Sequence, residues 1–69
     1  MLSIYRDDKG RTYQTEHHGG GFAIVVYDYY GDRIRREHIA GSRNHVQNVL
    51  DNRADQREWR WVGCQEKMA

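Results

Sequence analysis

The side chains best suited to chemistry in this chain are one thiol and four imidazoles. A thiol beside an imidazole can act as a nucleophile, and the two groups together can bind zinc. The spacing does not fit zinc, because there is no Cys-x2-Cys or His-x3-5-His pair, and the single thiol stands in no recognisable nucleophile motif. We therefore expect no metal site, no cofactor and no enzymatic activity from Cys64 and the four histidines, which are His17, His18, His38 and His45.

Two further patterns resemble ligand loops but predict turns. Asp7 and Asp8 precede Lys9-Gly10, yet a calcium loop needs several more oxygen ligands at fixed spacing. The Gly19-Gly20-Gly21 run is not followed by Lys-Ser/Thr, and the next residues indicate a strand rather than a helix start. We predict a tight turn at 7–10 and a flexible connection at 16–21.

Length and composition limit the architecture. A chain of 69 residues makes one small domain, which buries only about 60% of its unfolded surface. The single cysteine excludes an internal disulfide and favours a reducing, cytoplasmic compartment. The first residues lack the apolar core of a signal peptide, and no stretch is long enough to span a membrane.

Charge is dense and nearly balanced, with 11 basic and 10 acidic residues. The arginine fork suits carboxylates, phosphates and aromatic faces, and arginine is enriched at interfaces. A high-GC genome accounts for an arginine excess equally well. Nine of the basic residues are arginine, at positions 6, 11, 33, 35, 36, 43, 53, 57 and 60.

The hydrophobic pattern predicts an α+β domain in which a helix packs on one face of a small antiparallel sheet. Ser42 is a plausible N-cap for a helix over 43–54, whose apolar residues recur at three-and-four spacing. Residues 64–69 are expected to form a loose tail. Predicted strands, in the order β-β-β-β-α-β, cover 2–6, 11–15, 22–30, 33–39 and 57–62.

The stretch 22–30 is the longest apolar run and is predicted to be the central strand. It is apolar on both faces, and such strands are normally covered on both sides. One helix covers only one face. The other should be covered by the Trp59/Trp61 pair, a second copy of the chain, another partner, or long Arg and Tyr side chains. We expect a homodimer or an obligate binding protein.

Exposed aromatic and arginine side chains are typical of protein-binding hot spots. We therefore predict a surface that binds a host protein or protein complex through Tyr27, Tyr29, Arg35, Trp59 and Trp61. The alternative is a nucleic-acid-binding module with aromatic stacking surfaces beside a basic stripe. That stripe would bind through Arg33, Arg35, Arg36 and Arg43, with Arg57 and Arg60 of the last predicted strand as further members.

The residues Arg60-Trp61-Val62-Gly63-Cys64-Gln65 are similar to the Arg-Trp-Val-x-Cys-Gln ending of a small phage-encoded anti-CRISPR protein family. The similarity covers these six positions and carries over no site residues. It implies a small phage protein that blocks a larger host complex by occupying one of its surfaces. Together with the residue patterns, it leads us to expect a non-enzymatic, stoichiometric inhibitor or modulator.

Overall fold

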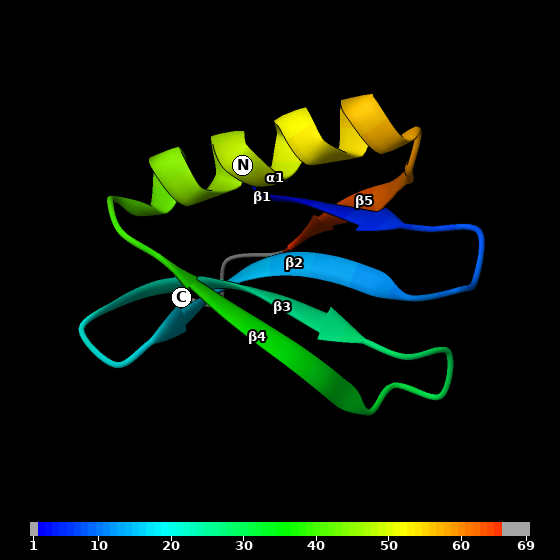
Figure 1. Ribbon diagram of the computed structural model, residues 1–69, viewed down its shortest axis with the longest axis horizontal. Coiled ribbons are helices and arrows are strands. Elements are labelled where there is room, and N and C mark those ends of the chain that lie inside the picture. Colours follow the sequence, from blue (N-terminus) through cyan, green and yellow to red (C-terminus); the bar gives the residue numbers. More distant parts are fainter. Residues whose placement is uncertain (1, 66–69) are drawn as a thin grey trace.

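The computed structural model describes residues 2–65 and confirms the α+β fold. One helix, α1 (Arg43–Arg57), lies across one face of an antiparallel sheet (Figure 1). The five strands of the sheet are β1 (Leu2–Arg6), β2 (Thr12–His18), β3 (Gly21–Tyr27), β4 (Arg33–Ile39) and β5 (Arg60–Gln65).

The strand order is β4-β3-β2-β1-β5, so β4 and β5 form the two edges. The apolar strand β3 is interior, but β2 is central, and the predicted central position of 22–30 is therefore wrong. β5 reaches the far edge because the chain crosses the whole sheet along α1 before it pairs with β1. Strand centres about 4.8 Å apart place the two edges roughly 19 Å from one another.

Four elements differ in extent from the predictions. β2 continues to His18, so 16–18 belong to this strand and the predicted flexible connection at 16–21 shortens to the turn before β3. β3 ends at Tyr27, so Tyr29 and Tyr30 lie in a turn rather than in the strand. The helix continues to Arg57, and the last strand is shifted to Arg60–Gln65. Residues 64 and 65 thus belong to β5 and not to a loose tail, whereas 66–69 lie outside the described residues.

Both ends of α1 are capped. The Ser42 hydroxyl accepts a hydrogen bond from the backbone N–H of His45 at 3.2 Å, which confirms the predicted N-cap. At the other end Glu58 adopts the left-handed conformation (φ 58°) that glycine usually supplies. The helix therefore ends without a glycine and turns directly into β5.

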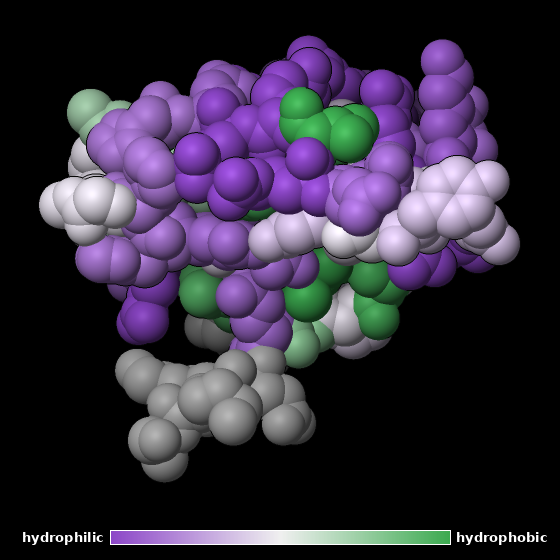
Figure 2. Space-filling view, turned by 90° about the horizontal axis from the view of Figure 1, so that it is seen from below, coloured by the Kyte–Doolittle hydropathy of each residue, from purple (hydrophilic) through white to green (hydrophobic). Residues whose placement is uncertain are grey.

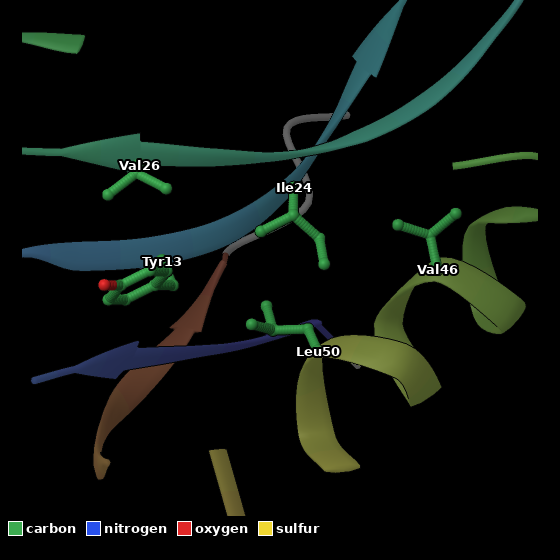
Figure 3. Close-up of a cluster of buried hydrophobic side chains, with 5 residues drawn as sticks. All are labelled: Tyr13, Ile24, Val26, Val46 and Leu50. Atoms are coloured by element: carbon green, nitrogen blue, oxygen red, sulfur yellow. The ribbon is translucent and has the colours of Figure 1, made fainter. Parts of the chain in front are cut away.

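The core lies between α1 and strands β1–β3. Val46 and Leu50 from α1 pack against Ile24 and Val26 from β3 and against Tyr13 from β2 (Figure 3). All five side chains are at most 3% exposed. This face also buries a polar residue, since Gln47 accepts from the hydroxyl of Thr15 at 2.8 Å and donates to the backbone oxygen of Ser3 at 3.1 Å.

The sheet face turned away from α1, here called the helix-free face, is already shielded within one chain. Ala23 and Val25 are 0% and 1% exposed although no second subunit is present. Their strand neighbours on this face carry longer polar side chains, and the surface is largely hydrophilic, with apolar patches that are small and separate (Figure 2). A second subunit is therefore not needed to cover Ala23 and Val25, and the homodimer stays a prediction. The neighbours are Gln14 and Arg36 beside Val25, and Glu16 and His38 beside Ala23.

Candidate functional site

The β1–β2 turn is an aspartate-anchored turn with a buried carboxylate. Asp7 Oδ1 accepts from the backbone N–H groups of Lys9 and Arg11, both at 2.9 Å. Oδ2 accepts from Arg11 Nε at 2.7 Å and from the Tyr13 hydroxyl at 2.9 Å. Gly10 takes a left-handed conformation (φ 82°) that closes the turn. The carboxylate thus ties the turn to the core residue Tyr13.

This environment changes the pKa of Asp7 in a definite direction. Burial raises the pKa of the carboxyl, but the hydrogen bonds from Arg11, Tyr13 and Lys9 outweigh burial and hold the pKa below its ordinary value. Burial, followed by the bond to Asp7, raises the pKa of the Tyr13 phenol. Asp7 is therefore a charged structural anchor rather than a group suited to proton transfer near neutral pH.

The β3–β4 turn repeats the same design on the surface. Asp28 Oδ1 accepts from the backbone N–H groups of Tyr30 and Asp32, both at 2.9 Å, and Gly31 is left-handed (φ 91°). Gly31 N–H donates to the Asp28 carbonyl at 3.0 Å, as Gly10 does to Asp7 at 3.2 Å. Both turns follow the pattern Asp-x-x-Gly, at 7–10 and 28–31.

The two turns and the α1–β5 junction lie at the same end of the sheet, here called the turn end (Figure 1). Tyr29 lies against Gly10, because a Cβ added to Gly10 would be 2.9 Å from Tyr29 Cδ1. Tyr29 therefore spans from its own turn to the neighbouring one. A shallow hollow forms there, lined by Arg6, Asp7, Asp8, Lys9, Gly10, Tyr29 and Arg60.

The turn end exposes large aromatic side chains that the fold leaves unburied. Tyr29 is 75% exposed and Tyr30 is 84% exposed, and their rings meet edge to face at 5.3 Å. Trp61, which follows Arg60 on β5, is 57% exposed. Aromatic rings beside basic groups supply contact area and charge-assisted hydrogen bonds. This combination suits the binding of a macromolecular surface.

A second basic surface lies between β4 and α1 and is here called the β4 groove. It is lined by Arg35, Arg36, Glu37, Arg53 and Arg57, although the strand register next to Val25 turns the side chain of Arg36 toward the helix-free face. Arg53 forms a two-pronged ion pair with Glu37, with N–O distances of 2.7 and 2.8 Å. The hydrogen bond from Arg53 lowers the pKa of Glu37, and Arg35 and Arg57 add to this effect. Glu37, the one acidic residue of the lining, is thus paired with Arg53, and the groove has a net positive charge.

The helix-free face carries the other arginines of β4. The strand register aligns Arg33 with Tyr27 and Arg36 with Val25, and the His18 and His38 rings lie nearby, 5.8 Å apart. The charge of Arg36 is the largest cause that lowers the pKa of His18. The predicted basic stripe is therefore divided, because Arg35 belongs to the β4 groove while Arg33 and Arg36 lie on the opposite face. Arg43 lies at the start of α1, near the other end of β4.

The structure does not gather the five predicted partner-binding residues into one patch. Tyr29 belongs to the turn-end hollow, and Trp61 lies on β5 next to its Arg60. Arg35 lies on the opposite edge strand, β4. Tyr27 is half-buried and donates a hydrogen bond to Glu16 on the helix-free face.

Trp59 is packed into the fold instead of being presented to a partner. Its ring stacks on Tyr13 with centroids 3.8 Å apart, and Arg57 lies over the ring at 5.6 Å. The tryptophan therefore supports the same tyrosine that binds Asp7. Trp61, two positions later, is instead exposed, because it lies on the edge strand β5.

Sequence reasoning missed several residues of these surfaces. Arg6, Lys9 and Tyr30 contribute to the turn end, and Arg53 to the β4 groove. Arg57 and Arg60 were predicted as part of the basic stripe, but the structure places them on two separate surfaces, Arg57 in the β4 groove and Arg60 at the turn end. A signal for the turn end existed in the repeated Asp-x-x-Gly pattern, which places Tyr29 and Tyr30 at a turn tip. The helical spacing of Arg53 and Arg57 also places them on one side of α1.

The thiol and the imidazoles form no recognisable reactive group in the part of the chain that the structure describes. Cys64 is half-buried in β5 opposite Ser3. Across residues 2–65, no three His, Cys, Asp or Glu side chains are arranged to hold a metal ion.

Comparisons with protein-family models, curated proteins and solved structures give no significant match. The hexapeptide that is similar to the anti-CRISPR ending forms β5. No helix within residues 2–65 has the length and apolar character needed to cross a bilayer.

Proposed function

We propose that this chain is a non-enzymatic binding protein that acts stoichiometrically, as an inhibitor or modulator of a larger protein or complex. The observation that carries the proposal is the exposure of Tyr29 and Tyr30 at the tip of a turn whose geometry needs neither ring. Tyrosine beside arginine and lysine is the composition of protein-binding hot spots. The turn end is then the primary contact surface.

The basic side chains around Tyr29 indicate the character of the partner. Arg6, Lys9 and Arg60 line the hollow together with the acid Asp8, and the second acid, Asp7, is satisfied internally by four hydrogen bonds. Three basic groups against the one remaining acid leave the hollow positively charged. A partner with an acidic rim around an apolar pocket complements this surface. A phage origin and the blocking of a host complex are also part of this proposal. They fit the similarity between Arg60–Gln65 and the anti-CRISPR ending.

The proposal is tested by affinity capture from a lysate of the source cells with three immobilised forms of the protein. Wild type and the control Val62→Ala, which alters an exposed apolar residue on β5 that lines neither the turn-end hollow nor the β4 groove, should retain the same protein. The double variant Tyr29→Ala/Tyr30→Ala should lose it by at least about tenfold, or about 1.4 kcal/mol. Equal recovery by all three forms would contradict a role for the turn end.

A nucleic-acid partner is the second candidate, and the arginines on both faces of β4 favour it. The measurement is fluorescence anisotropy of labelled duplex and single-stranded DNA at low and near-physiological salt. Phosphate contacts make binding fall steeply with salt, by roughly one power of the salt concentration for each contact. Binding of this kind that is lost in Arg33→Gln/Arg36→Gln would support nucleic acid over protein.

A further inference from the structure

Strand β4 is an open sheet edge that is exposed along almost its whole length. It pairs with β3 on one side and, as the last strand in the order β4-β3-β2-β1-β5, has an unpaired side. Residues 33–38 are exposed, and only Ile39 is half-buried. Every second N–H and C=O of such an edge points outward and can pair with another strand. From Arg35 to Ile39 the register with β3 is regular, beyond the irregularity near Tyr27.

The side chains of β4 select the kind of strand that can be added. Arg35 faces the groove with Arg53 and Arg57, and Arg33 and Arg36 lie on the opposite face. A strand added beside β4 would therefore meet arginine on both of its faces. Glu37 does not offset this charge, because Arg53 already holds both of its carboxylate oxygens.

A second copy of β4 is a poor occupant of this edge. Pairing β4 with itself places arginines from two chains at neighbouring cross-strand positions, and like charges there are destabilising. An apolar strand would leave the guanidinium groups desolvated without a partner. An acidic strand instead gains backbone hydrogen bonds and charge-assisted bonds to the arginines.

We propose that β4 accepts an extended acidic segment of a partner protein as a sixth strand, with its carboxylates bound by Arg35 and Arg57 in the β4 groove and by Arg33 and Arg36 on the other face. This mode of recognition takes affinity from the main chain and specificity from alternate side chains. The inference rests on the proposed function only in that the partner is a protein. It uses a surface separate from the turn end.

The direct test uses fluorescein-labelled short peptides in which pairs of adjacent glutamates alternate with pairs of threonines, so that an extended peptide carries carboxylates on both faces. Binding is measured by anisotropy with the full chain at low salt. Three comparison probes are the same peptide with lysine for glutamate, the glutamate peptide with N-methylated alternate backbone nitrogens, and a single-stranded oligonucleotide of equal charge. The glutamate peptide should bind, and the lysine peptide should not. N-methylation keeps the charge but blocks strand pairing, and it should weaken binding by about tenfold or more.

Each other result overturns the proposal. Equal binding of the N-methylated peptide would mean that charge attraction operates without strand addition. Tighter binding of the oligonucleotide would identify the arginines as a phosphate surface. No binding of the glutamate peptide would remove the acidic-strand assignment. Amide hydrogen exchange gives an independent readout, since the outward N–H groups of 33–39 should become protected when the glutamate peptide is bound.

Matched variants separate this inference from the proposed function. Arg35→Gln/Arg57→Gln removes two charges from the β4 groove, and Arg6→Gln/Arg60→Gln removes two from the turn end, all at exposed positions. Peptide binding should fall about tenfold in the first variant and stay within about twofold in the second. Tyr29→Ala/Tyr30→Ala should also bind the peptide normally, so a failure at one surface leaves the other assignment intact. Circular dichroism confirms that each variant is folded.

Discussion

The two hairpin turns at the turn end have the same backbone design and opposite surroundings. In each, an aspartate accepts two backbone N–H groups at 2.9 Å, and a left-handed glycine follows three residues later. Asp7, however, is buried at 7% exposure and also binds Arg11 and Tyr13, whereas Asp28 binds only backbone groups and is half-exposed. One turn is part of the core, and the other is a surface feature.

The comparison shows which residues the turn geometry leaves free to vary. Aspartate and glycine satisfy the local backbone in both turns, so the two tip positions carry no structural requirement. The β1–β2 turn has Asp8 and Lys9 at its tip, which are ordinary solvated residues. The β3–β4 turn has Tyr29 and Tyr30, which expose aromatic surface. Under the proposed function, that choice serves binding and not folding.

The largest difference is expected when each aspartate is truncated. Asp7→Ala leaves the buried Tyr13 hydroxyl and Arg11 without their acceptor, and should cost about 2–4 kcal/mol of unfolding free energy. Asp28→Ala exposes its two N–H groups to water and should cost about 1 kcal/mol or less. Urea unfolding monitored by tryptophan fluorescence measures both values. Equal losses would show that the two turns contribute alike.

The glycines provide a second contrast. Both are left-handed, so alanine at either position costs about 1 kcal/mol in backbone strain. At Gly10 the new Cβ would also approach Tyr29 Cδ1 to 2.9 Å, whereas open space surrounds Gly31. We expect Gly10→Ala to lower the melting temperature further than Gly31→Ala and to displace Tyr29. A similar shift in both variants would mean that Tyr29 moves aside without cost.

The pH dependence of stability tests whether Asp7 is a charged anchor. Because its folded pKa lies below the ordinary value near 3.9, its contribution is present above that value and is lost as the pH falls toward the folded pKa. Glu37 has a lowered pKa as well, chiefly through its hydrogen bond from Arg53, and adds a slope of the same sign. Relative to wild type, Asp7→Asn should therefore lose more unfolding free energy at pH 5 than at pH 2. The unfolding free energy of the variant should also change less with pH over this range.

Glu37→Gln is the control for this experiment. It removes the second lowered carboxyl but leaves the β1–β2 turn intact, so its profile should keep the slope that Asp7 contributes. A wild-type slope in Asp7→Asn would contradict the assignment of Asp7 as the anchor. The measurement is the urea concentration at the midpoint of unfolding, determined at each pH for wild type and both variants.

The fold was predictable from the sequence because local signals agree with the global arrangement. The Ser42 N-cap and the alternation of apolar and polar residues in β1 specify their own local structure. The strand order was not predictable, since nothing local states that the chain after α1 returns to β1 rather than to β4. The buried Gln47 and the shielding of Ala23 and Val25 also depend on neighbours from distant strands. Sequence reasoning predicted the residue types of the site but not which of them are free to bind. Trp59 and Trp61 are the same residue type two positions apart, and only the fold buries one against Tyr13 and exposes the other on β5.

The smallest change in unfolding free energy is expected when Tyr29 or Tyr30 is replaced. A small change would support the view that the β3–β4 turn is a surface feature whose rings are not needed for folding. Tyr30→Ala removes a ring that is 84% exposed and should change unfolding free energy by less than about 0.5 kcal/mol. Tyr29→Ala should cost slightly more, because Tyr29 contacts Gly10. Urea unfolding of both variants beside Asp7→Ala provides the scale. If Tyr29→Ala destabilised the chain as strongly as Asp7→Ala, Tyr29 would be a structural bridge between the two turns, and its exposure would no longer indicate a partner. If both changes are silent in stability yet abolish capture of a specific protein, the tip of the β3–β4 turn has no role except recognition.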